Sequence, residues 1–167
     1  KRFGVGPGRI GIMGASCGGH LSLLVGTAAP TATPEESDPV DRESSRVQAV
    51  VAYFPGTDNL NFGRENTTIA EHFCAQGAPT GEFDFHQWNT ESQRFDRITD
   101  PKLIRQRFRE TSPITHISAN SAPALLLHGD KDTLVPLQQS EVFIARLHEA
   151  GVPHELFLVE GVGHGYS

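Results

Sequence analysis

Apolar and polar stretches alternate along this chain in a way that predicts strands and helices in turn. Four short apolar runs, bounded by glycine or proline, predict buried strands; they cover residues 9–14, 47–54, 124–129 and 154–160. Apolar residues at intervals of three and four predict amphipathic helices at residues 17–28 and 137–150. This alternation favours an α/β fold with a mainly parallel sheet and helices on both of its faces.

The same spacing predicts which helix residues face the core. They are Leu21, Leu24 and Val25 in the first helix, and Phe143, Leu147 and Ala150 in the second. Gly151 and Pro153 are expected to end the second helix, because glycine favours a helix terminus and proline cannot continue one.

Two polar stretches separate these elements. Residues 30–46 are rich in proline, serine and acidic side chains, which predicts a surface loop. Residues 57–122 are too long for a plain connection and are expected to form a lid-like insertion, with a helix near 100–110. The aromatic residues of this insertion, notably Phe83, Phe85 and Trp88, either line an acyl or aryl site or form a small core of the insertion itself.

Composition and charge narrow the function classes. The formal net charge is −6 and no cluster of lysine and arginine stands out, which argues against nucleic acid as a partner. No apolar stretch approaches the roughly 20 residues of a membrane span. Two cysteines make no disulfide framework, and no histidine pair has a zinc-like spacing, so we predict no metal and no cofactor. The chain starts at Lys1 without a signal-like segment; we expect the native N-terminus to be absent, so the cellular compartment is not readable.

The strongest chemical signal lies between the first strand and the first helix. Gly14-Ala15-Ser16-Cys17-Gly18 matches G-x-S-x-G, in which a sharp strand-to-helix turn exposes the central serine as a nucleophile. Glycines on both sides are expected because a Cβ there would strike the neighbouring strand or helix. We expect Cys17 to have a buried side chain and to supply its backbone N–H to an oxyanion. The alternative is a tight glycine-rich turn with an incidental serine.

A nucleophilic serine needs a base and an orienting acid, and both types of residue follow later strands. His164 lies in the glycine-rich loop after the fourth strand, and Asp132 follows the third. Carboxyl ends of parallel strands meet at one sheet edge, so Ser16, Asp132 and His164 are expected to meet. Asp130 and Asp58 remain alternative acids. His20 is expected on a helix face and His128 as a hydrogen-bonded core histidine.

Three segments resemble the esterase and lipase group of the α/β-hydrolases, close to small carboxylesterases of the feruloyl-esterase-like and prolyl-oligopeptidase-like kinds. They are GRIGIMGASCGGHLSLL, SPITHISANSAPALLLHGDKDTLVPLQQSE and GVGHGYS. The resemblance implies a partial α/β-hydrolase domain over residues 1–167, with Ser16 as nucleophile, Asp132 as acid and His164 as base. It implies Cys17 N–H as one oxyanion donor, although the family usually has alanine there. It also implies that earlier strands of the fold precede this segment.

The expected function is therefore hydrolysis of small carboxylic esters through an acyl-enzyme. A peptidase of the prolyl-oligopeptidase kind would share the same three residues. A third hypothesis is a catalytically weak fragment that acts as a binding or assembly unit. Because the strand at 9–14 is expected to leave an unpaired, apolar edge, we expect a homo-oligomer or association with an N-terminal half.

Overall fold

The computed structural model describes residues 4, 6, 8–28, 35, 37–40, 42–79, 81 and 83–166. The expected surface loop at 30–46 lies partly outside these residues, and its described part is exposed and contains neither helix nor strand.

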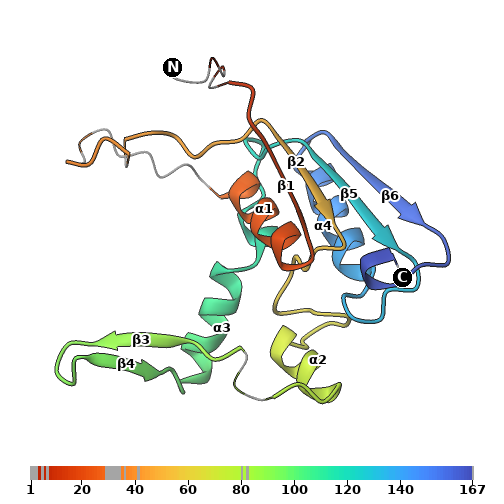
Figure 1. The fold of residues 1–167 in the computed structure, drawn as a ribbon. Helices are drawn as coiled ribbons and strands as arrows, with labels where there is room; N and C mark the ends of the chain where they lie inside the picture. Colours follow the sequence, from red (N-terminus) through yellow and green to blue (C-terminus); the bar gives the residue numbers. More distant parts are fainter. Residues whose placement is uncertain are drawn as a thin grey trace.

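A parallel four-stranded sheet forms the centre of the molecule (Figure 1). Its strands are β1 (Gly11–Ala15), β2 (Ala49–Tyr53), β5 (Ala124–Gly129) and β6 (His154–Val159), arranged in that order across the sheet. The four predicted strands and the mainly parallel sheet are thereby confirmed. Within the described residues β1 pairs with β2 alone, which places β1 at one edge.

Both long helices pack on the same face of the sheet, so the expectation of helices on both faces is wrong for the described part of the chain. Helix α1 (Cys17–Thr27) lies so close to β2 that a Cβ on Gly26 would meet Val50 Cγ2. Helix α4 (Gln138–Glu149) reaches the same face through Ser140, whose Oγ lies 2.7 Å from Nδ1 of His128. Val50 and His128 share a face because side chains alternate along strands and Val50 pairs with Ala124.

The core lies between this face and the two helices. In α4 the predicted stripe is confirmed, with Phe143 and Leu147 fully buried and Ala150 packed against them. In α1 the prediction is wrong, because Leu21 and Val25 are exposed and Leu24 is only partly buried. Because α1 packs closely on the sheet, the residues that face the sheet are mostly small. The buried positions are Gly19, Ser22, Leu23 and Thr27.

The opposite face of the sheet carries apolar side chains without a helix of the described residues over them. Met13 on β1 is 66% exposed and Phe157 on β6 is 55% exposed. Between them Val51 and Leu125 are only partly buried, in register with Met13. We call this side of the sheet, with Met13, Val51, Leu125 and Phe157, the bare face.

The segment between β2 and β5 folds into elements of its own at the end toward which the strands point (Figure 1). They are α2 (Ile69–Ala75), β3 (His86–Asn89), β4 (Arg94–Arg97), α3 (Pro101–Glu110) and the short 3-10 helix η1 (Pro113–His116). The helix predicted near 100–110 is α3; its N-cap is Asp100, and Pro101 occupies its first turn. Helix α2 begins at a capping box in which Thr68 and Glu71 exchange hydrogen bonds.

The buried Gln139 of α4 ties the start of this segment to the core. Its Oε1 accepts the N–H groups of Thr57 and Asp58, each at 2.8 Å, and its Nε2 donates to Asn61 O. The loop after β2 is therefore fixed at the carboxyl end of the sheet. Among the described residues, no helix combines the length and the apolar character needed to cross a membrane.

Candidate active site

Ser16 occupies a strained turn between β1 and α1. Its φ is 53°, which is a left-handed conformation that a residue with a Cβ rarely adopts. The Ser16 N–H donates to Tyr53 O at 2.9 Å, and Ser16 O accepts from the N–H of His20, also at 2.9 Å. These bonds hold the serine between strand β2 and the first turn of α1.

Close backbone packing explains one glycine of the motif but not the other. A Cβ on Gly14 would lie 2.2 Å from Gly18 O, so only glycine fits where α1 turns back over β1. The same expectation for Gly18 is wrong, because nothing lies within 4 Å of a Cβ placed there. The second close approach is at Gly19, where a Cβ would lie 3.1 Å from both Gly14 O and Tyr53 O.

The Ser16 hydroxyl points to a histidine instead of capping its own helix. Ser16 precedes α1 but makes no side-chain capping bond. Its Oγ lies 3.0 Å from Nε2 of His164, which begins the short 3-10 helix η2 (His164–Tyr166) in the connection after β6. The other ring nitrogen of His164, Nδ1, lies 2.8 Å from Oδ2 of Asp132. Three residues from three loops thus form one hydrogen-bonded row at the carboxyl edge of the sheet.

Asp132 is buried and its carboxylate is fixed from both sides. Oδ1 accepts the N–H groups of Leu134 and Val135 at 3.0 and 2.9 Å, so Oδ2 is turned to His164. His128 lies behind it, with Nε2 3.4 Å from Oδ2 and 2.9 Å from Val135 O. Since a carbonyl only accepts, His128 carries its proton on Nε2, and burial lowers the pKa of this imidazole. The prediction of a hydrogen-bonded core histidine is confirmed.

The two alternative carboxylates have other partners. Asp130 accepts the Gly161 N–H at 2.7 Å and lies 3.4 Å from Lys131 Nζ, so it holds the loop that carries His164. Asp58 accepts the N–H groups of Leu60 and Asn61 and shapes the turn after β2. Among the described residues, the carboxylate that contacts His164 is Asp132.

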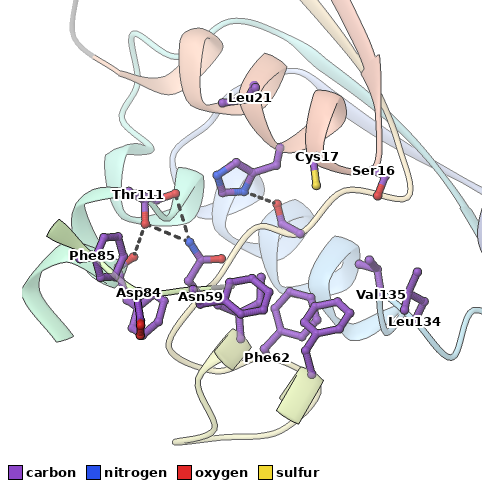
Figure 2. A pocket seen from close by; sticks show the side chains of 16 residues that line it. Ser16, Cys17, Leu21, Asn59, Phe62, Asp84, Phe85, Thr111, Leu134 and Val135 are labelled. Atoms are coloured by element: carbon purple, nitrogen blue, oxygen red, sulfur yellow. Dashed lines mark hydrogen bonds between the residues drawn. The ribbon is translucent and has the colours of Figure 1, made fainter. Parts of the chain in front are cut away.

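A largely apolar cavity of about 600 Å³ opens beside Ser16 (Figure 2). Its lining comes from the loop after β1, helix α1, the segment between β2 and β5 and the loop between β5 and α4. The residues are Ser16, Cys17, His20, Leu21, Gly56, Asn59, Phe62, Ile69, Phe73, Phe83, Asp84, Phe85, Phe108, Thr111, Leu134 and Val135. The size and character of this cavity fit a small organic ligand.

Two of the three predicted aromatic residues line this cavity. Phe83 stacks on Phe73 of α2, with ring centroids 5.5 Å apart, and Phe85 packs edge-on against Phe108 of α3 at 5.0 Å. Trp88 lies apart, on β3, where it packs against Phe95 and is half exposed. The structure therefore brings Phe83 and Phe85 to the cavity and leaves Trp88 on the β3–β4 hairpin.

Cys17 differs from its prediction in one respect. Its side chain is exposed and lines the cavity, because the first turn of α1 projects beyond the sheet and the helix–sheet contact begins at Gly19. Its backbone N–H belongs to the first turn of a helix, where no intrahelical acceptor exists. That N–H stands beside Ser16, at the positive end of the helix dipole.

His20 is a cavity residue that the sequence placed only on a helix face. Its Nδ1 donates to Gly56 O, at 3.0 Å, and burial lowers the pKa of its imidazole. Asn59, Phe62, Ile69, Thr111 and Val135 were also not anticipated as cavity residues, because they come from separate elements that only the tertiary fold brings together. No group of three or more histidine, cysteine or acidic residues suited to a metal ion occurs in the described part of the chain.

Comparison with known proteins places this geometry in a family. The BD-FAE family model matches residues 1–147. Esterase LipC of Mycobacterium tuberculosis is 28% identical over 99% of this chain and 37% of its own length. The probable carboxylic ester hydrolase LipM of the same organism is 32% identical over 89% of this chain and 30% of its own length. The chain thus spans about a third of the length of these curated relatives.

Solved structures give the same result. The acetyl ester-xyloside bifunctional hydrolase of Caldicellulosiruptor lactoaceticus superposes with a TM-score of 0.70 and 30% identity, over 96% of this chain and 49% of that one. Esterase 2 of Thermogutta terrifontis, in its propionate-bound form, superposes with a TM-score of 0.62 and 26% identity, over 98% and 48%. The expected resemblance is confirmed: the chain belongs to the BD-FAE family, and it is similar in sequence and fold to esterases of the α/β-hydrolase group.

Proposed function

We propose that this chain carries the nucleophile, base and acid of a carboxylic ester hydrolase that works through an acyl-enzyme. The observation that carries the proposal is the hydrogen-bonded row from Ser16 Oγ through His164 to Asp132, with distances of 3.0 and 2.8 Å. A serine, an imidazole and a buried carboxylate in this order are the parts that nucleophilic acyl transfer requires.

In the first half-reaction Ser16 Oγ attacks the ester carbonyl carbon while His164 Nε2 takes the hydroxyl proton. The new imidazolium is stabilised by Asp132 Oδ2, which also keeps the ring in the orientation that presents Nε2 to Ser16. As the tetrahedral intermediate collapses, the C–O bond to the alcohol breaks and His164 returns the proton to the leaving alkoxide. The products are an acylated Ser16 and a free alcohol.

In the second half-reaction water replaces the alcohol. His164 Nε2 takes a proton from the water as its oxygen attacks the acyl carbon, and then returns a proton to Ser16 Oγ as the acid leaves. In both intermediates the carbonyl oxygen becomes negative. The Cys17 N–H, in the first turn of α1, is the proposed donor to that oxygen.

The cavity beside Ser16 is the proposed site for the apolar part of the ester. The segment at 57–122 acts as a lid-like insertion, because it supplies the cavity wall from α2, α3 and the loop with Phe83 and Phe85. This wall favours esters with an apolar acyl or alcohol group over polar peptides. Esters are therefore preferred to the prolyl-peptide substrates that the same three residues would also serve.

A fluorophosphonate probe with intact-mass readout tests the proposal. An activated Ser16 displaces fluoride from phosphorus and gains the mass of the phosphonyl group. We expect one adduct on Ser16, absent from Ser16→Ala and His164→Ala and retained in Ser92→Ala, whose serine is exposed on the β3–β4 hairpin. An unlabelled wild-type chain that also fails to hydrolyse 4-nitrophenyl esters would overturn the proposal. Faster cleavage of aminoacyl-proline anilides than of esters would favour the peptidase.

A further inference from the structure

The hydrogen-bond network around Asn59 fixes which way its carboxamide points. Thr111 Oγ1 donates its single proton to Arg107 O at 2.9 Å, so toward Asn59 it only accepts. The atom of Asn59 that lies 3.1 Å from Thr111 Oγ1 and 3.4 Å from Thr111 O must therefore be the amide nitrogen. The amide oxygen, Oδ1, consequently points to the other side.

The backbone of Asn59 leaves the side chain little freedom to turn. Its N–H donates to Ser112 Oγ at 2.9 Å, and its carbonyl accepts from the N–H of Ile69 at 2.9 Å. Asn59 is thus held between the start of α2 and the end of α3. The residue is buried, with 6% of its surface exposed.

Asn59 Oδ1 is a buried acceptor without a hydrogen-bond partner, and it belongs to a residue that lines the cavity. Figure 2 shows the nitrogen of Asn59 turned to Thr111 and the oxygen turned away from it, toward the aromatic side chains. Buried polar atoms are nearly always satisfied, so an unmet acceptor in the wall of a binding cavity calls for a donor.

We infer that Asn59 determines specificity by accepting a hydrogen bond from a neutral hydroxyl on the ester. This inference rests on the proposed function, because it assumes that the cavity beside Ser16 receives the apolar part of the substrate. The substrate class is an ester whose apolar group carries a hydroxyl at the distance from the carbonyl that matches Asn59.

The surroundings of Asn59 define this class further. The walls are mostly phenylalanine, so the body of the group is apolar. An ionised carboxylate on that group only accepts hydrogen bonds and would be repelled by the lone pairs of Oδ1, whereas a hydroxyl can donate a hydrogen bond to Oδ1. Because Oδ1 is buried in the cavity wall, the donor must be small and its entry must part the lining slightly. A hydroxyl meets both conditions better than an ammonium group, which would lose most of its hydration.

Matched ester pairs test the inference. The substrates are methyl esters of unbranched acids of increasing length, each with and without a terminal hydroxyl, so that the hydroxyl is moved stepwise along the cavity. The measured quantity is the ratio of kcat/KM for the hydroxylated ester to that for its plain partner. Both values come from one preparation, so the ratio does not depend on the fraction of folded enzyme.

We expect the ratio to peak at one chain length in the wild-type chain, and Asn59→Leu to lower that peak by roughly five- to tenfold. Asn59→Ala serves in the same way if the leucine variant does not fold. Asn61→Leu is the matched control, because its amide bonds Asp58 and Asn66 and lies outside the cavity lining. A merely structural role for Asn59 would change both esters of a pair equally and leave the ratio unchanged.

Binding without catalysis separates this inference from the proposed function. Ligand-observed NMR compares α,ω-diols with 1-alkanols of equal length on the full chain. Diol preference that Asn59→Leu abolishes, in a chain that neither reacts with the fluorophosphonate probe nor hydrolyses esters, would support Asn59 as the hydroxyl acceptor of the cavity and reject the proposed function. Ester hydrolysis whose ratio is the same in wild type and Asn59→Leu at every length would overturn the inference alone, and so would equal binding of diols and alkanols.

Discussion

The two faces of the central sheet are covered very differently. On the helix-covered face Val50, Ala52 and Leu126 lie beneath α1 and α4 and are almost completely buried. On the bare face Met13 and Phe157 are more than half exposed. The row of Ser16, His164 and Asp132 is nevertheless fully hydrogen-bonded. The candidate site is formed by the loops at the carboxyl edge alone, whereas burial of the sheet requires packed elements on both of its faces.

The largest effects are expected at the carboxyl edge. Ser16→Ala and His164→Ala should each lower kcat for ester hydrolysis by on the order of 10⁵-fold, because the residues act as a unit. Asp132→Asn should cost less, on the order of 10⁴-fold, since Ser16 and His164 remain. Steady-state rates on 4-nitrophenyl esters measure all three.

Asp130→Asn and Asp58→Asn are the matched carboxylate controls. Asp130 anchors the loop at Gly161 and Asp58 shapes the turn at Leu60, so their loss should affect thermal stability more than kcat. If either control variant were crippled while Asp132→Asn stayed active, the assignment of Asp132 would be wrong.

The bare face is expected to drive association. Its apolar side chains, together with the edge of β1 that no other described strand pairs with, form a surface of the kind that pairs with another chain. At micromolar concentration we expect the wild-type chain to run larger than a monomer in size-exclusion chromatography with light scattering. The double variant Met13→Glu/Phe157→Glu should shift it toward the monomer.

Val40→Glu is the control for this experiment, because Val40 is 75% exposed but lies in the loop between α1 and β2. It should leave the oligomeric state unchanged. A wild-type monomer that binds no hydrophobic dye would show that the bare face needs no partner.

Much of the sheet and of the candidate site was predictable from the sequence, because the signals are local. Each strand is a short apolar run; Ser16 follows one of them directly, and Asp132 and His164 follow two others within a few residues. Parallel strands then bring their carboxyl ends to one edge, so a pattern in sequence becomes a cluster in space.

The rest depended on tertiary contacts that leave no local pattern. The inward side of α1 was misassigned because its close packing on β2 buries Gly19 and Ser22, whereas Leu21 faces the cavity. The face of the sheet on which each helix packs depends on how the chain crosses from one strand to the next, and the spacing of apolar residues does not reveal this. The position of Asn59 and the direction of its carboxamide are fixed by hydrogen bonds to Ser112 and Thr111, which lie far along the chain.

The cavity wall offers a smaller effect, on specificity. Phe83→Ala and Phe85→Ala remove rings that pack on Phe73 and Phe108, so the relative kcat/KM across acyl esters should change several-fold. Trp88→Ala is the control, because Trp88 packs on Phe95 outside the cavity lining. Changes in stability without any change in the specificity profile would show that the rings form only a small core of the insertion.

The smallest expected effect is on the pH dependence of stability, and it involves a buried histidine of the helix-covered face. Burial lowers the pKa of His128, and of His20 beside the cavity, below the ordinary value of 6.5. The folded chain therefore keeps both rings neutral at pH values where the unfolded chain already binds protons. Their contribution to stability is complete above 6.5 and is lost progressively as the pH falls through the folded-state pKa values.

His128→Gln isolates one of these two histidines. Glutamine keeps a donor for Val135 O and an acceptor for the Ser140 hydroxyl, but it does not titrate. The free energy of unfolding, from urea titrations between about pH 7 and pH 5, should fall less steeply in this variant, by at most about 1.4 kcal/mol per pH unit. An unchanged slope in His128→Gln would mean that His128 binds its proton equally in the folded and unfolded chains, contrary to its complete burial beside Asp132.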